Sequence, residues 1–129
     1  MKKQARAWLD SARDDLAVVT AILNRDDLTH MVAFHCQQAL EKSFKAVLEE
    51  HGKAVPRAHD LITLHSQAEE YVKLEVDSEI LKQLNELYID SRYPSDLGLL
   101  PGGKPPKKLS EKMHDLAQEV YDTIDKVMA

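Results

Sequence analysis

The sequence predicts an all-α protein, an up-and-down bundle of four long helices and one short helix. Three observations lead to this prediction. Apolar residues recur at three- and four-residue steps over several long stretches, which is the spacing of one helix face. The chain has only four glycines and five prolines, most of them in one stretch, and it shows no strand-like alternation. A length of 129 residues fits a single domain over residues 1–129.

The first helix is expected from about Lys3 to Asn24. Its apolar residues lie on one face, with charged residues on the opposite face: Ala5, Trp8, Leu9, Ala12, Leu16, Val19 and Leu23. The sequence NRDD ends this helix, because Asn and Asp favour turns.

The second helix is expected from Thr29, as its cap, to about His51. Gly52 follows, where a left-handed residue is needed. Its apolar residues again form a stripe: Ala33, Cys36, Leu40, Phe44, Val47 and Leu48. Gln37 borders this stripe and Gln38 lies further round the helix. Each partly buried amide needs hydrogen-bond partners, which are either neighbouring backbone groups such as helix ends or a ligand.

The remaining elements follow from caps and breakers. A short third helix is expected to begin near His59–Asp60, and Asp77 is expected to cap a fourth helix. A flexible loop rich in Gly and Pro, at about 94–108, separates it from a last helix that begins near Leu109 or Ser110.

Composition excludes several classes of function. The net charge of −5 and pI near 5.6 disfavour bulk nucleic-acid binding, although a local basic patch could still bind it. A single cysteine, Cys36, excludes an intramolecular disulfide and a multi-cysteine zinc site, and we expect no metal and no cofactor. There is no signal-peptide pattern and no apolar run of about 20 residues, so we expect a cytoplasmic protein without a membrane span.

The polar residues of the second helix allow two interpretations. Glu41 precedes Lys45 by four residues, which is the favourable order for a helical ion pair. A solvent-exposed helix face explains Glu41, Lys42 and Lys45. The alternative is that Lys42 or Lys45 binds a phosphate.

Helix ends carry the other candidates. Asp60 is suited to capping the third helix, with His59 beside it. Arg92 and Tyr93 end the fourth helix, where they either complement its dipole or contact the phosphate and base of a nucleotide. The loop lysines are either solvated or available to a phosphate or an acidic partner: Lys104, Lys107, Lys108 and Lys112.

Several motifs in a fixed order resemble the HEPN family. They are Trp8, Ala12 and Asp15-Leu16 on the first helix, FHCQQALEKSFKAVL on the second, then HDL at 59–61 and SRYP at 91–94. The resemblance implies a helical bundle that pairs as a homodimer, often beside a small nucleotidyltransferase partner. Some members are toxins that cut RNA, and others have been proposed only to bind nucleotides.

The ribonuclease members of the family use an Arg followed by a His four to six residues later. At the matching place this chain has Arg92 followed by Leu97, Gly98 and Leu99, none of which can transfer a proton. The string RDDLTH at residues 25–30 fits the spacing, but it lies in the first interhelical turn, and so loose a pattern arises by chance. We therefore predict no catalytic residue and no RNA cleavage that depends on Arg92.

These observations predict one candidate ligand site. It comprises Lys42, Lys45, His59, Arg92 and Tyr93, because a second and a fourth helix running in the same direction would end together. The expected function is a non-catalytic homodimer that binds a nucleotide or a nucleotidyltransferase-type protein. The alternatives are an RNA-cleaving enzyme with a non-standard active site and a purely structural module. If the site is real, Arg92→Ala and Lys45→Ala should weaken binding without changing the melting temperature.

Overall fold

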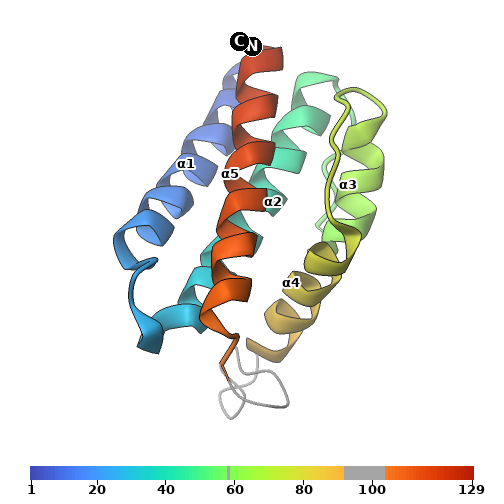
Figure 1. Cartoon of the computed structure of the whole chain (residues 1–129). Coiled ribbons are helices and arrows are strands. Elements are labelled where there is room, and N and C mark those ends of the chain that lie inside the picture. Colours follow the sequence, from blue (N-terminus) through green and yellow to red (C-terminus); the bar gives the residue numbers. More distant parts are fainter. Residues whose placement is uncertain (58, 92–103) are drawn as a thin grey trace.

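The computed structural model describes residues 1–57, 59–91 and 104–129, with only the backbone described at 88–91. In these residues it contains no strand and a short 3₁₀ helix at Asp26–Leu28. The all-α prediction is therefore confirmed, with α3 as the short helix. Figure 1 shows the arrangement of the five α-helices: α1 (Lys3–Ile22), α2 (Thr29–Glu50), α3 (Leu61–Glu69), α4 (Ser78–Ser91) and α5 (Lys107–Met128).

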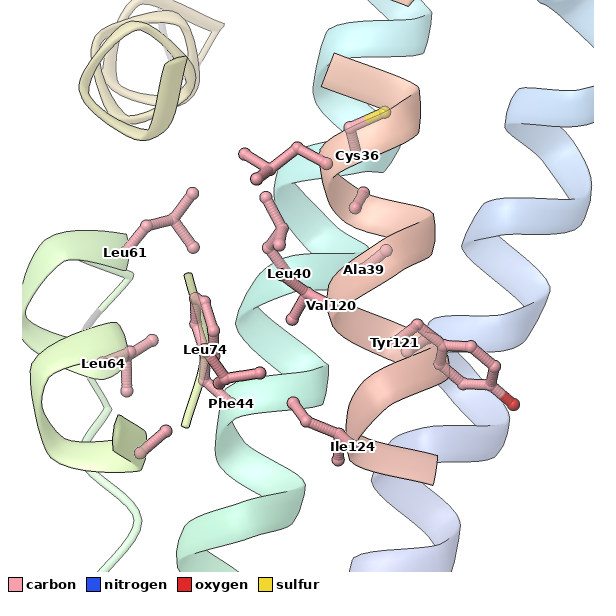
Figure 2. Packing of buried hydrophobic residues seen from close by; sticks show 14 of the residues in the cluster. Cys36, Ala39, Leu40, Phe44, Leu61, Leu64, Leu74, Val120, Tyr121 and Ile124 are labelled. Carbon is pink, nitrogen blue, oxygen red and sulfur yellow. The ribbon is translucent and has the colours of Figure 1, made fainter. Parts of the chain in front are cut away.

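Helix α2 is the central element of the bundle. It packs against each of the other four α-helices, and its Leu40 and Phe44 are fully buried. Figure 2 shows these two side chains between the apolar residues of neighbouring elements: Leu61 and Leu64 of α3, Val120 and Ile124 of α5, and Leu74. Because neighbours cover so much of α2, polar residues on its flanks become buried too.

The direction of α3 is shown by its contacts along α2. His59, just before α3, lies against Glu41, and the His65 ring is 5.7 Å from that of Phe44. Tyr71, just after α3, stacks on His51 at 4.2 Å. Residues later in the α3 segment thus contact residues later in α2, so the two helices run parallel.

Helix α4 then runs back in the opposite direction (Figure 1). Its Asn85 side chain meets Asp60 at the beginning of α3, and His65 of α3 bonds the carbonyl of Leu74, which precedes α4. The prediction that the second and fourth helices run in the same direction is therefore wrong. The reason is that His59, two residues before α3, lies against Glu41, so the chain has returned along α2 before α3 begins.

The end of α2 agrees with the boundary predicted from the sequence, whereas its beginning does not. Gly52 has φ +66°, and Lys53 N–H donates to the Leu48 carbonyl at 2.9 Å, so the left-handed C-terminal motif is confirmed. Thr29 does not cap α2. Its backbone is already helical (φ −60°, ψ −32°) because the 3₁₀ turn leads directly into α2, whereas a capping residue needs an extended conformation.

The caps of α3 and α4 are confirmed. Asp60 Oδ1 accepts from the Ile62 amide at 3.0 Å, and Asp77 Oδ1 accepts from the Glu79 amide at 3.0 Å. Helix α5 begins at Lys107, earlier than predicted, because Pro106 has the extended backbone of an N-cap and lets the helix start directly after it. The predicted loop at 94–108 is therefore too long at its end, and residues 92–103 lie outside the described residues.

Candidate functional site

A line of buried polar side chains lies one helical turn apart on α2. Gln37, Glu41 and Lys45 are 1%, 5% and 5% exposed. Glu41 accepts hydrogen bonds from both of the others, each at 3.2 Å. The ion pair between Glu41 and Lys45 is confirmed, but the interpretation of a solvent-exposed face is wrong for both residues. The reason is that side chains from outside α2, His59 and Trp8, lie against them.

Two further residues connect this line to the surface. His59 Nδ1 lies 2.8 Å from Glu41 Oε1, so Nδ1 carries the proton when Glu41 is ionised. Gln38 Nε2 donates to Gln37 Oε1 at 2.7 Å. The His59 side chain is 46% exposed, so the cluster reaches solvent at this end. We call these five residues the Glu41 network: Gln37, Gln38, Glu41, Lys45 and His59.

Helix α1 covers the ammonium group of the network. Lys45 Nζ lies 5.4 Å from the centroid of the Trp8 ring. An ammonium group at this distance from an indole is attracted by the negative face of the ring. Lys45 is thus held by a carboxylate on its own helix and by an aromatic ring on the neighbouring helix.

A second charged group links α1 to α2. Asp15 accepts from Lys42 Nζ at 2.6 Å, and its other oxygen lies 2.9 Å from His35 Nδ1. The Asp15 side chain is only 11% exposed. Sequence analysis missed this site, although the sequence carries a signal for it. Asp15 is one helical turn beyond Ala12, on the apolar stripe of α1, where a carboxylate needs partners.

The structure brings together some of the predicted site residues. Lys45 and His59 meet at Glu41, whereas Lys42 is bound to Asp15. Arg92 and Tyr93 lie outside the described residues. The site was predicted at the end of α2, but the Glu41 network lies around the middle of this helix. The chain returns along α2 before α3 begins, so His59 meets Glu41 there.

The described partners of the two glutamines are side chains of α2 itself. Gln37 and Gln38 bond each other, and Gln37 bonds Glu41. The structure shows no side-chain bond from either amide to a backbone group or a helix end in the described residues. The glutamines therefore orient the carboxylate of Glu41 within a side-chain network.

The charges in these two groups are already matched. Glu41 accepts from three donors, and each lysine has a carboxylate partner. Removing one member of a buried ion pair costs about 3–5 kcal/mol, because it leaves the other charge uncompensated. A phosphate that recruited Lys45 would have to compete with Glu41 against a cost of this order.

The beginning of α3 is fixed by a polar clamp from α4. Asn85 donates to Asp60 Oδ1 at 2.8 Å and accepts from the Leu61 amide at 2.8 Å. The hydrogen bond from Asn85 is the main reason that the pKa of Asp60 is lowered, and bonds from Thr63 and the Ile62 amide add to it. Asp60 is thus held by both α3 and α4, and this fixes the position of the preceding residue, His59.

Two of the lysines after the Gly/Pro stretch, Lys104 and Lys107, contact the turn between α1 and α2. Lys104 Nζ donates to the Asp27 carbonyl at 2.7 Å, and Lys107 Nζ lies 3.0 Å from the Asp26 carboxylate. These contacts hold the turn between α1 and α2 against the start of α5. Lys108 and Lys112 are exposed.

The RDDLTH string lies in the same turn. Arg25 makes two bonds to Asp27, at 2.9 and 2.8 Å, and these bonds lower the pKa of the Asp27 carboxyl. Burial lowers the pKa of His30, whose Nδ1 atom has no described partner. No described contact joins Arg25 to His30, so the prediction of a surface turn followed by a helix start agrees with the structure.

Other kinds of site receive no support from the described residues. No three His, Cys, Asp or Glu side chains gather there in a way that could hold a metal ion. None of the helices in that part of the chain is long and apolar enough to cross a bilayer. Cys36 is buried, and its burial raises the pKa of the thiol, so it stays protonated.

Comparison with known proteins identifies the family. The chain matches the HEPN domain family over residues 5–127. It is similar to the crystal structure of TT1696 from Thermus thermophilus, with 28% identity, a TM-score of 0.77, and coverage of 97% of this chain and 98% of that one.

A second solved structure, that of ST0689, an archaeal HEPN homologue, is 21% identical to this chain and has a TM-score of 0.69. The match covers 99% of this chain and 100% of that one, and it shows that the two share a fold. A search of curated proteins gave no match. The family match spans the bundle from α1 to α5 and contains the Glu41 network and Asp15. The chain therefore belongs to the HEPN domain family.

Proposed function

We propose that this HEPN domain is a non-catalytic binding module that forms a homodimer and engages a protein partner of the nucleotidyltransferase type. The single observation that carries the proposal is a partly exposed face shared by α1 and α2. We call it the α1–α2 face, and it consists of Asp15, Val18, Met31, Phe34, Gln38 and Lys42.

The α1–α2 face combines exposed apolar residues with a matched charge pair. Val18 lies one turn beyond Asp15 on α1, and Met31 one turn before His35 on α2. Because Asp15 contacts His35 and α1 runs opposite to α2 (Figure 1), Val18 and Met31 lie at the same level of the helix pair, one turn from that contact. They are 40% and 36% exposed. Exposed apolar side chains beside a matched charge pair suit a protein contact, since the cores of interfaces are apolar and enriched in aromatic residues and Met.

The choice of a protein over a nucleotide rests on the two lysines. Lys42 and Lys45 are already bound to Asp15 and Glu41. A nucleotide phosphate needs cations that are available, whereas a protein surface can pack over a neutral network. Nucleotide binding remains the competing function.

The non-catalytic part of the proposal rests on the sequence. Leu97, Gly98 and Leu99 occupy the positions where the ribonuclease members carry a His. The purified protein should leave labelled RNA intact without divalent metal. Metal-independent cleavage that is abolished by Arg92→Ala would show that the protein is a ribonuclease after all.

The homodimer contact is tested with matched substitutions on and off the α1–α2 face. Met31→Glu and Val18→Glu should convert the dimer to a monomer, as measured by light scattering, because each places a charge at the proposed contact. Ile62→Glu is the control, since Ile62 is 46% exposed on α3 and lies outside the face. A dimer that survives both face variants would refute this face as the contact. A thermal shift with nucleotides, absent with a nucleotidyltransferase protein, would favour the competing function.

A further inference from the structure

An open hollow lies between the first turns of α1 and the end of α2. It has a volume of about 550 Å³ and is lined by Gln4, Ala7, Trp8, Ser11 and Glu49. The small side chains of Ala7 and Ser11 line the hollow beside the Trp8 ring. This volume falls in the range of pockets that take a large side chain or a small molecule, about 300–1,000 Å³.

The polar groups around this hollow have no partners among the described residues. The Gln4 amide, the Ser11 hydroxyl and the Glu49 carboxylate form no side-chain hydrogen bond or ion pair in that part of the chain. This distinguishes Glu49 from Glu41, which accepts from three donors on the same helix and before α3. The hollow therefore presents an unmatched negative charge beside an aromatic ring.

The charges around the hollow determine which chemical group it can bind. Lys45 lies near the Trp8 ring, but its charge is matched by Glu41 at 3.2 Å. The open charge of the hollow is then that of Glu49. An indole face and a carboxylate together suit a flat cation, because a guanidinium group can stack on the ring and donate two hydrogen bonds to the carboxylate.

We infer that this hollow binds an arginine side chain of a partner polypeptide, with the guanidinium between Trp8 and Glu49. The Gln4 and Ser11 side chains accept its remaining N–H groups or bond the backbone that carries it. The inference does not depend on the homodimer or on the nucleotidyltransferase-type partner. It assigns a role to a part of α1 and α2 that lies beyond the α1–α2 face.

The test uses the only tryptophan of the chain, Trp8, as the reporter. The 129-residue chain is titrated with the peptide acetyl-Gly-Arg-Gly-amide while the Trp8 fluorescence is recorded. The matched probe carries citrulline, which has the same shape without the charge. The arginine peptide should give a saturable change with a Kd on the order of 1 mM, and the citrulline peptide should give none.

Substitutions show whether the carboxylate is responsible. Glu49→Gln should weaken arginine binding roughly tenfold, because it removes the charge-assisted hydrogen bonds. Glu111→Gln, an exposed glutamate on α5, should leave the affinity unchanged. Equal binding of the two peptides, equal binding by Glu49→Gln, or no saturable response to arginine at millimolar concentration would each overturn the inference.

Discussion

Replacing Lys45 by Met tests the Glu41 network directly. The substitution keeps a long, flexible side chain under Trp8 and removes the charge that Glu41 faces at 3.2 Å. Breaking a buried ion pair in this way costs about 3–5 kcal/mol. Glu41 would keep its bonds from Gln37 and His59, so we expect about 3 kcal/mol, the lower end of that range. For a chain of this size the melting temperature should fall by roughly 10–15 °C.

The assay is urea unfolding followed by far-ultraviolet circular dichroism at one fixed protein concentration, because a homodimer would make stability depend on concentration. Lys112→Met is the matched control, since Lys112 is exposed on α5, and its free energy of unfolding should stay within about 0.5 kcal/mol of the wild type. The double variant Glu41→Gln with Lys45→Met should lose less stability than the sum of the single variants.

A loss below about 1 kcal/mol for Lys45→Met, with additive effects in the double variant, would refute a structural ion pair. It would restore the expectation, drawn from the sequence alone, that Lys45 can be replaced without changing the melting temperature. The burial of Lys45 reverses that expectation, so Lys45→Ala would not separate a binding role from a folding role.

Three other substitutions or treatments test separate parts of the structure. Asp60→Ala should cost about 1 kcal/mol, because the cap of α3 is lost. The folded-state pKa of Asp60 is lowered, chiefly by Asn85, so its stabilising effect is complete above the unfolded value of about 3.9 and disappears as pH falls through the folded value. Urea unfolding over a pH series should show this acid dependence in the wild type and less of it in Asp60→Ala, and equal curves would contradict it. Phe44→Ala should cost about 3–5 kcal/mol, because Phe44 is fully buried, and a loss under about 1 kcal/mol would show that the site collapses or is less buried. Cys36 should react with a thiol reagent only at the rate of unfolding, because burial raises the pKa of its thiol, and rapid reaction of the native protein would contradict its burial.

Much of the fold could be predicted because local signals determine it. The apolar spacing on α1, α2 and α5 predicted those helices, and Asp60, Asp77 and Gly52 predicted three helix boundaries. The direction of α4 could not be predicted in this way. It depends on where the residues between α2 and α3 pass, and their path follows from tertiary contacts such as that of His59 with Glu41.

The candidate site was predicted less well for a related reason. Glu41 and Lys45 resemble an exposed helical pair, since their spacing is the same whether a neighbouring element covers them or not. Asp15 could have been noticed, because it interrupts an apolar stripe, but its partners His35 and Lys42 lie 20 and 27 residues away. Burial and long-range pairing are properties of the packed bundle, and no local pattern encodes them.

We propose above all that this HEPN domain works as a homodimer through the α1–α2 face. Light scattering of the purified protein at tens of micromolar, the concentration range of a moderate interface, measures this most directly. The wild type should have twice the chain mass of 14.6 kDa, and Met31→Glu should have the single-chain mass. A wild-type mass of 14.6 kDa would contradict the homodimer, and an unchanged dimer in Met31→Glu would contradict the assigned face.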